Sequence, residues 1–171
     1  MQLQQPIGLV GTGAMGQGIA QVMAQAGLKV SLFDTLPGAA TNAREQLAST
    51  FAMLRQKGRI TPQAASAALD RVQVVNSLQE LDDCQVVIEA IVEDLEAKQQ
   101  LFRQLDALLD PATLLASNTS SLSITAIASV CAHPQRVAGL HFFNPVPLMR
   151  IVEVIGGIAT APQVIDQLQA L

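Results

Sequence analysis

Residues 7–20 read IGLVGTGAMGQGIA, and this stretch decides the fold of the chain. A short apolar run is followed by Gly11, Gly13 and Gly16 in the pattern G-x-G-x-x-G, and a helical pattern continues from Met15. In such a unit the first glycine permits a tight turn, the second lets the backbone approach a pyrophosphate, and the third lets the helix pack closely on the strand. The helix N terminus adds amide donors for the phosphates. The stretch therefore predicts the first strand and helix of a dinucleotide-binding domain.

An acidic residue at the end of the second predicted strand, residues 29–33, specifies the dinucleotide. Asp34 lies eighteen positions after Gly16, where a carboxylate can accept hydrogen bonds from both ribose hydroxyls. A negative charge there repels a 2′-phosphate, and the next basic residue is Arg44, so we expect NAD and not NADP. The cofactor contacts expected from this part of the chain are Gly11, Thr12, Gly13, Ala14, Met15, Gly16 and Asp34.

The rest of the chain alternates short apolar strands with longer helices. Strands are predicted at residues 6–10, 29–33, 72–75, 86–88, 113–116, 136–140 and 149–155, and helices at 15–25, 37–56, 62–70, 95–109, 124–130 and 161–171. Strands that are apolar on both faces and separated by helices form a parallel sheet covered on both sides. We expect an α/β fold in which residues 1–171 form one Rossmann-type domain, a doubly wound, mostly parallel sheet with helices on both faces.

Composition excludes several classes of function. Ten Lys and Arg against fourteen Asp and Glu leave a net charge of −4, so nucleic acid is not an expected partner. No apolar run reaches the roughly 18 residues of a membrane span, and residues 1–5 lack the features of a secretory leader, so we expect a cytoplasmic protein with no membrane partner. Cys84 and Cys131 are isolated, and we expect two buried thiols and no metal site.

Charged residues make up only 14% of the chain, against roughly a quarter in an average domain. We therefore expect apolar surface near His141 and the last helix that another part of the protein covers.

His141 is the predicted catalytic base. It follows the strand predicted at 136–140, and ligands of open α/β sheets bind at the carboxyl ends of the strands. An imidazole is the usual acceptor for the proton of a hydroxyl oxidised near neutral pH. Glu153, in the next predicted strand, could hold one ring nitrogen and stabilise the imidazolium. We expect the other histidine, His133, at the surface.

Polar residues at the end of another predicted strand, Asn118 to Ser121, could hydrogen-bond a substrate oxygen or the nicotinamide carboxamide. For Ser121 we favour a different role, the cap of a helix that begins near Leu122. Ser120, His141 and Glu153 could also form a hydrolase triad, but the chain lacks a G-x-S-x-G elbow, and a triad would not explain the glycine motif.

Two groups of charged residues remain. Arg55, Lys57 and Arg59 end the second predicted helix, where they either stabilise its C terminus or bind the phosphates of a substrate with a nucleotide handle. Asp94 and Lys98 have the spacing of an ordinary ion pair on a helix.

Four stretches of the chain resemble the NAD-binding domain of the L-3-hydroxyacyl-CoA dehydrogenases, a group that includes the 3-hydroxybutyryl-CoA dehydrogenases of fatty acid metabolism and β-oxidation. They are GLVGTGAMGQGIA (8–20), IEAIVEDLEAK (88–98), ASNTSSL (116–122) and GLHFFNPVPLMRIVEVI (139–155). The resemblance implies an oxidoreductase that interconverts L-3-hydroxyacyl-CoA and 3-oxoacyl-CoA by hydride transfer to and from NAD. It leaves the acyl chain length and the pathway open.

The resemblance also implies roles for single residues. His141 would be the base and Glu153 its partner, with Ser120 and Asn144 near the 3-oxygen and the nicotinamide. Further cofactor contacts would be Ala90, Ile91, Glu93, Lys98, Asn118 and Ser120, and contacts to the CoA substrate would be Thr50, Lys57 and Ser120.

Members of this family continue into a second, all-helical domain that forms the dimer interface and closes over the acyl chain. The resemblance therefore implies a homodimer for the full-length protein, and a piece that alone is weakly active or inactive. Two alternatives stay open: a related sugar-acid dehydrogenase of the gulonate type, which would not use CoA phosphates, and a catalytically incomplete NAD-binding module.

Overall fold

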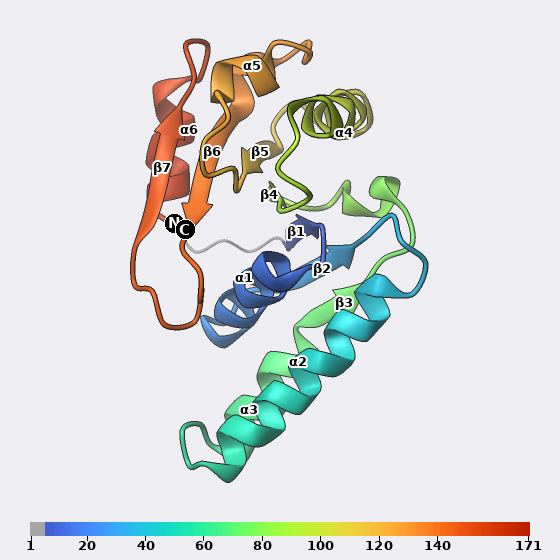
Figure 1. The fold of residues 1–171 in the computed structure, drawn as a ribbon, viewed down its shortest axis with the longest axis vertical. Helices are drawn as coiled ribbons and strands as arrows, with labels where there is room; N and C mark the ends of the chain where they lie inside the picture. The colour runs from blue at the N-terminus through green and yellow to red at the C-terminus, as the bar shows by residue number, and fades with distance from the viewer. Residues whose placement is uncertain (1–5) are drawn as a thin grey trace.

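One seven-stranded sheet organises the protein in our computed structural model, which describes residues 6–171 (Figure 1). The strand order is β3-β2-β1-β4-β5-β6-β7, and all neighbours pair in parallel except β6 and β7. The bounds are β1 Ile7–Val10, β2 Val30–Phe33, β3 Val72–Val74, β4 Val86–Glu89, β5 Leu114–Ser117, β6 Val137–Phe142 and β7 Val152–Gly156. The predicted doubly wound, mostly parallel sheet is confirmed. Residues 1–5, for which the sequence predicts no leader, lie outside the described residues.

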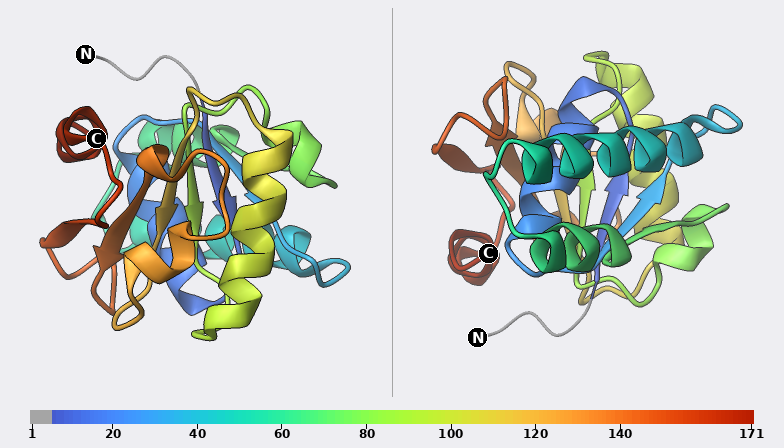
Figure 2. Two further views of the ribbon diagram at one scale, coloured as in Figure 1. Left: turned by 90° about the horizontal axis from the view of Figure 1, so that it is seen from above. Right: turned by 90° about the horizontal axis from the view of Figure 1, so that it is seen from below.

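Helices cover both faces of this sheet, as predicted (Figure 2). One hydrophobic core lies between the sheet and α1, α2, α3 and α6, and the other lies between the sheet and α4 and α5. The bounds are α1 Ala14–Gln25, α2 Ala39–Gln56, α3 Pro62–Asp70, α4 Leu95–Leu108, α5 Ile124–Ala128 and α6 Pro162–Gln169, with short 3-10 turns at Leu78–Leu81 and Pro134–Arg136. No helix within residues 6–171 is long and apolar enough to cross a membrane.

The order of the strands positions the ligand edge. The chain moves outward from β1 to β2 and β3, and then returns to place β4 on the other side of β1. Loops after β1 and β4 therefore lead to opposite faces, which opens a crevice at the carboxyl ends of these two central strands.

Two predicted strand boundaries differ from the structure by two or more residues. Strand β6 runs two residues past the predicted end, so His141 lies within the strand and not after it. The extension arises because β7 pairs with this part of β6 and supplies hydrogen-bond partners that the local sequence does not reveal. Strand β7 begins at Val152 and not at residue 149, because the backbone turns at Pro145, whose carbonyl accepts from the amides of Leu148 and Met149.

A buried ion pair fastens α4 to the start of β6. Arg136, 3% exposed, donates from Nε and Nη2 to Asp106 Oδ1 at 3.1 and 2.9 Å. Oδ2 of the same carboxylate accepts from the amides of Ala132 and His133. His133 lies in the same turn, with its Nδ1 3.4 Å from Asp106 Oδ1 and its side chain 39% exposed. The prediction of a surface histidine is therefore confirmed. Of the two cysteines, Cys84 is buried as predicted and Cys131 only half-buried.

Asp106→Asn is expected to lower the free energy of unfolding at pH 7 by about 1.5–3 kcal/mol, because Arg136 loses its charged partner. Burial raises the pKa of Asp106, but the bonds from Arg136 and from two backbone amides outweigh it and hold the pKa below its ordinary value of 3.8. The folded carboxyl thus stays ionised at a pH where the unfolded one is protonated. The stabilisation is present above about pH 4 and is lost as the pH falls through the folded value.

Urea unfolding of wild type and variant at pH 7 and at pH 3 measures this difference. Asp82→Asn, which alters an exposed carboxylate, is the control and should change stability by less than about 0.5 kcal/mol. A difference between wild type and Asp106→Asn that grows toward pH 3 would contradict the assignment.

Candidate functional site

The glycine-rich loop has the geometry that the motif predicts. Gly11 has a φ of +97°, and a Cβ there would lie 2.6 Å from the Ala90 carbonyl oxygen, so only glycine fits this turn. A Cβ on Gly16 would lie 1.9 Å from the Gly11 carbonyl oxygen, which explains how closely α1 packs on the turn. A Cβ on Gly13, by contrast, would meet nothing within 4 Å. The loop is thus tight on its inner side and open where a phosphate would approach the N terminus of α1.

A cavity of about 540 Å³ lies beside this loop, between the ends of β1, β2 and β4 and the first turns of α4. Apolar side chains form much of its wall, including Phe33, Leu36 and Ile91. Among the described residues that line it, Asp34 is the only charged one. The shape and lining suit a flat aromatic group with a polar handle.

Asp34 joins the end of β2 to the glycine-rich loop. Oδ2 accepts from the amide and the hydroxyl of Thr12, both at 2.8 Å, and Oδ1 accepts from the Leu36 amide at 3.0 Å. Burial raises the pKa of Asp34, but these hydrogen bonds outweigh it and hold the pKa below 3.8. An ionised carboxylate is therefore kept at the cavity edge in a fixed position. Thr12, predicted as a cofactor contact, serves in the structure as a partner of Asp34.

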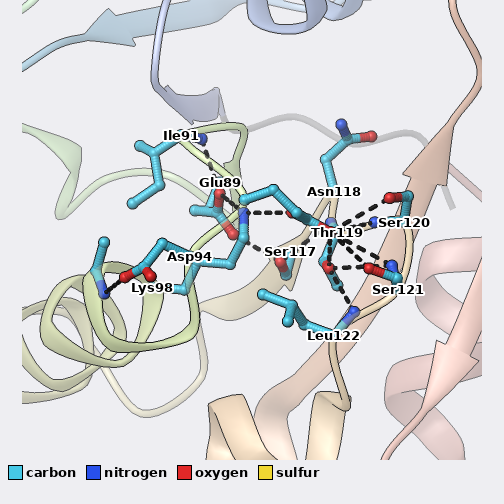
Figure 3. A network of polar contacts seen from close by, with 12 residues as sticks. Glu89, Ile91, Asp94, Lys98, Ser117, Asn118, Thr119, Ser120, Ser121 and Leu122 are labelled. Carbon is cyan, nitrogen blue, oxygen red and sulfur yellow. Dashed lines mark hydrogen bonds and ion pairs between the residues drawn. The ribbon is translucent and has the colours of Figure 1, made fainter.

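Glu89 is the buried centre of a polar network at the ends of β4 and β5 (Figure 3). The carboxylate is fully buried and accepts from the Ile91 amide at 2.7 Å, from Lys98 Nζ at 2.5 Å and from the Ser117 hydroxyl at 2.6 Å. Sequence reasoning assigned Glu89 no role. The signal was an acidic residue directly after the all-apolar run Val86–Ile88.

Lys98 is buried and has other partners than the predicted Asp94. It is 1% exposed and bridges Glu89 and Glu93, with its Nζ 3.4 Å from Glu93 Oε2. Asp94, its predicted partner, instead accepts from the Ala97 amide and caps α4. The predicted Asp94–Lys98 pair is wrong, because the first turn of α4 directs Lys98 inward against β4, where the buried Glu89 carboxylate compensates its charge.

Glu93 accepts hydrogen bonds from the segment that follows β5. Its Oε1 accepts from the Thr119 hydroxyl at 2.6 Å, and from the Ser120 amide and hydroxyl at 2.9 and 3.3 Å (Figure 3). Burial raises the pKa of Glu93, but the bonds from Thr119 and Ser120 and the charge of Lys98 outweigh it and lower the pKa to about 2. The predicted capping role of Ser121 is wrong: its amide also points to Glu93, and Ser123 caps α5.

His141 and Glu153 lie directly opposite each other on β6 and β7, and His141 Nδ1 is 2.9 Å from Glu153 Oε2. A carboxylate can only accept, so Nδ1 is the donor in this contact, and in the neutral imidazole Nε2 then carries the lone pair. The imidazole packs against Phe143, with ring centroids 4.4 Å apart, and its side chain is 15% exposed. This is the arrangement of a general base held in one tautomer by an acidic partner.

The remaining predicted residues fall into two regions. Asn144 and Ser120 are exposed on the loops after β6 and β5, which are neighbouring strands, so both lie at the edge that carries His141. Thr50 lies toward the C-terminal end of α2 and Lys57 directly follows the helix, at the end that lies away from the sheet (Figure 1). The structure therefore brings together the predicted catalytic and cofactor residues, and places Thr50 and Lys57 apart from them.

Exposed apolar side chains are most frequent near the end of the chain, around the strand that carries Glu153. The largest group comes from β7 and the loops on either side of it: Leu148, Met149, Ile151, Val152, Ile155 and Ile158. We call this group the β7 apolar surface.

Comparisons with known proteins agree with the geometry. The family model "3-hydroxyacyl-CoA dehydrogenase, NAD binding domain" matches residues 6–171. The chain is 43% identical to a probable 3-hydroxybutyryl-CoA dehydrogenase of Bacillus subtilis, over 100% of this chain and 59% of the relative. It is 44% identical to the 3-hydroxyadipyl-CoA dehydrogenase of Escherichia coli, over 96% of this chain and 34% of the relative.

Among solved structures, 3-hydroxybutyryl-CoA dehydrogenase from Escherichia coli aligns with a TM-score of 0.94 and 43% identity, over 98% of this chain and 35% of that one. The chain thus spans about three fifths or less of these relatives. From the family match over residues 6–171, the chain belongs to the 3-hydroxyacyl-CoA dehydrogenase family, as its NAD-binding domain.

Proposed function

We propose that the protein interconverts L-3-hydroxyacyl-CoA and 3-oxoacyl-CoA, with His141 and Glu153 as its general-base pair. The observation that carries the proposal is the 2.9 Å contact between His141 Nδ1 and Glu153 Oε2 at the ligand edge of an NAD-binding sheet. The names of the relatives, 3-hydroxybutyryl-CoA and 3-hydroxyadipyl-CoA dehydrogenases, support the class of substrate.

The residues at the crevice fit NAD. The open face at Gly13 suits a pyrophosphate, and the ionised Asp34 beside the cavity suits the hydroxyls of a ribose. Further contacts would come from Ala90, Ile91, Glu93, Asn118 and Ser120, while Lys98, which is buried, would act through Glu93. When bound, NAD supplies the acceptor for the hydride that leaves C3 of the substrate.

His141 moves the proton. Its Nε2 accepts the hydrogen bond of the 3-hydroxyl and takes the proton as hydride leaves C3, while Glu153 stabilises the imidazolium through Nδ1–H. Ser120 and Asn144, on the two flanking loops, would hydrogen-bond the 3-oxygen. In the reducing direction, the imidazolium returns the proton to the carbonyl oxygen.

Binding of the CoA part would fall to α2. Arg55, Lys57 and Arg59 are all exposed and form a positive group at the C-terminal end of this helix, with Thr50 about two turns earlier. Such a group suits the phosphates of CoA.

A second, helical domain would cover the β7 apolar surface and complete the site, and the full-length protein would be a homodimer. The support is the exposed apolar side chains on and around β7, the strand that pairs with the strand of His141, and the greater length of the relatives.

The test of the function is NADH oxidation with acetoacetyl-CoA, followed at 340 nm, for this chain and for its longest natural form. The long form is expected to turn over, and this chain to bind NADH with little or no turnover. The proposal would be contradicted if the long form binds NADH but does not oxidise it with any 3-oxoacyl-CoA.

Asp34→Ala is expected to weaken NAD binding by about 10- to 100-fold, because hydrogen bonds to a charged group contribute about 1.5–3 kcal/mol. Titration calorimetry of this chain with NAD measures the change. The matched control is Thr12→Val, which removes one donor to Asp34 but keeps the carboxylate, and should cost less. An unchanged Kd in Asp34→Ala would contradict the ribose contact.

A further inference from the structure

The end of β6 that carries His141 lacks a backbone partner on one side. Parallel pairing between β5 and β6 ends where Ser117 lies opposite Gly139. Strand β6 continues for three more residues, which pair only with β7 on the other side. The segment that holds the catalytic histidine would therefore be a two-stranded ribbon, which is a poorly constrained arrangement by itself.

The side chain of Asn118 supplies the missing contact. Its Oδ1 accepts from the backbone amide of Phe142 at 2.8 Å, and the backbone amide of Asn118 donates to the Glu89 carbonyl of β4, also at 2.8 Å. Because a backbone N–H can only donate, the orientation of the Asn118 amide is fixed, with Oδ1 toward Phe142 and Nδ2 turned away. In Figure 3 this side chain points away from the Glu89–Lys98 network.

This contact acts on His141 through the backbone. The N–H of Phe142 belongs to the peptide group that joins it to His141, so the bond to Asn118 fixes the orientation of that group. Glu153 holds the imidazole from β7. His141 is thus constrained from both sides of its strand, at the backbone from β5 and at the ring from β7.

We propose that Asn118 is a positioning residue for His141, in addition to any contact with the cofactor. The proposal rests on the proposed function, since it assumes that His141 is the base. With Oδ1 engaged by Phe142, only the Nδ2 hydrogens of Asn118 are free for a ligand, so a contact with NAD would have Asn118 as donor.

Two substitutions separate the two roles. Asn118→Ala removes both the acceptor and the donor, whereas Asn118→Asp keeps an acceptor for Phe142 and removes the donor. Asn42→Ala, which changes an exposed asparagine on α2, is the matched control. Hydrogen exchange of the Phe142 amide and the low-field NMR signal of His141 Nδ1–H report on the strand without any substrate. The chain has only two histidines, so His133→Gln assigns the ring signals.

In Asn118→Ala we expect exchange of the Phe142 amide to accelerate about 3- to 10-fold, as loss of one hydrogen bond predicts, and the Nδ1–H signal to broaden or vanish. In the catalytically active long form, kcat at saturating NAD should fall about tenfold or more in Asn118→Ala. Any weakening of NAD binding by loss of the Nδ2 donor should be shared by Asn118→Asp, which lacks the same donor. Asn118→Asp should restore the protection of the Phe142 amide and most of kcat.

Weaker NAD binding in Asn118→Ala, with unchanged Phe142 exchange and Nδ1–H signal, would overturn the positioning role. A wild-type long form that fails on every 3-oxoacyl-CoA, while both NMR signals respond as expected, would overturn the proposed function and leave the support of the His141 strand by Asn118 standing.

Discussion

His141→Ala should lower turnover of the catalytically active long form by about 10²- to 10⁴-fold, the usual contribution of a general base. The 3-hydroxyl then has no acceptor for its proton while hydride leaves. The Kd for NAD should stay within a few-fold of wild type, since the glycine-rich loop and Asp34 are untouched. Steady-state kinetics with acetoacetyl-CoA and calorimetry with NAD measure the two quantities separately.

The matched control is His133→Ala, because His133 is the other histidine of the chain and faces Asp106. It should leave kcat within about twofold. Glu153→Gln should be intermediate, since an amide oxygen still accepts from Nδ1 but stabilises an imidazolium less well than a carboxylate. Full activity of His141→Ala would remove His141 from the mechanism.

Lys98→Met should lower the free energy of unfolding by about 3–5 kcal/mol, the cost of leaving a buried charge without its partner. Methionine has nearly the length of the lysine stem, so packing is kept. The carboxylate of Glu89, fully buried, would lose its only cationic partner among the described residues. Urea unfolding of this chain at pH 7, followed by circular dichroism, measures the loss.

Two further variants make this result specific. Lys29→Met changes an exposed lysine and should alter stability by less than about 0.5 kcal/mol. Removing both buried charges, in Lys98→Met with Glu89→Gln, should recover part of the loss, because no unpaired ion then remains. If Lys98→Met is no more destabilising than Lys29→Met, the buried pair does not stabilise the fold.

The network around Glu89 links the cofactor side of the sheet to the catalytic side. The Glu89 carboxylate accepts hydrogen bonds from Lys98 and Ser117. Lys98 also pairs with Glu93, and the Glu93 carboxylate accepts from the Ser120 amide. Asn118 donates from its backbone amide to the Glu89 carbonyl and accepts at Oδ1 from the Phe142 amide of β6. The ends of β4, β5 and β6 are thus connected by polar contacts, although each belongs to a different part of the sequence.

Local patterns in the sequence were sufficient for most of the fold. The spacing of Gly11, Gly13 and Gly16 predicts the turn, the close packing of α1 and the open approach that the structure contains. Alternation of apolar strands and helices predicts the doubly wound sheet, because a strand buried on both faces needs apolar residues throughout. These features depend on neighbours within a few residues, so a single sequence contains them.

Only the tertiary structure decided which distant side chains meet. It extended β6 through His141 by pairing it with β7, moved Lys98 from Asp94 to Glu89 and Glu93, and placed Asn118 against Phe142. The physical reason is that burial and pairing across the sheet set the cost of an unpaired charge or amide. Helical spacing favoured Asp94 for Lys98, but a lysine excluded from water pairs with Glu89, the carboxylate that is excluded with it.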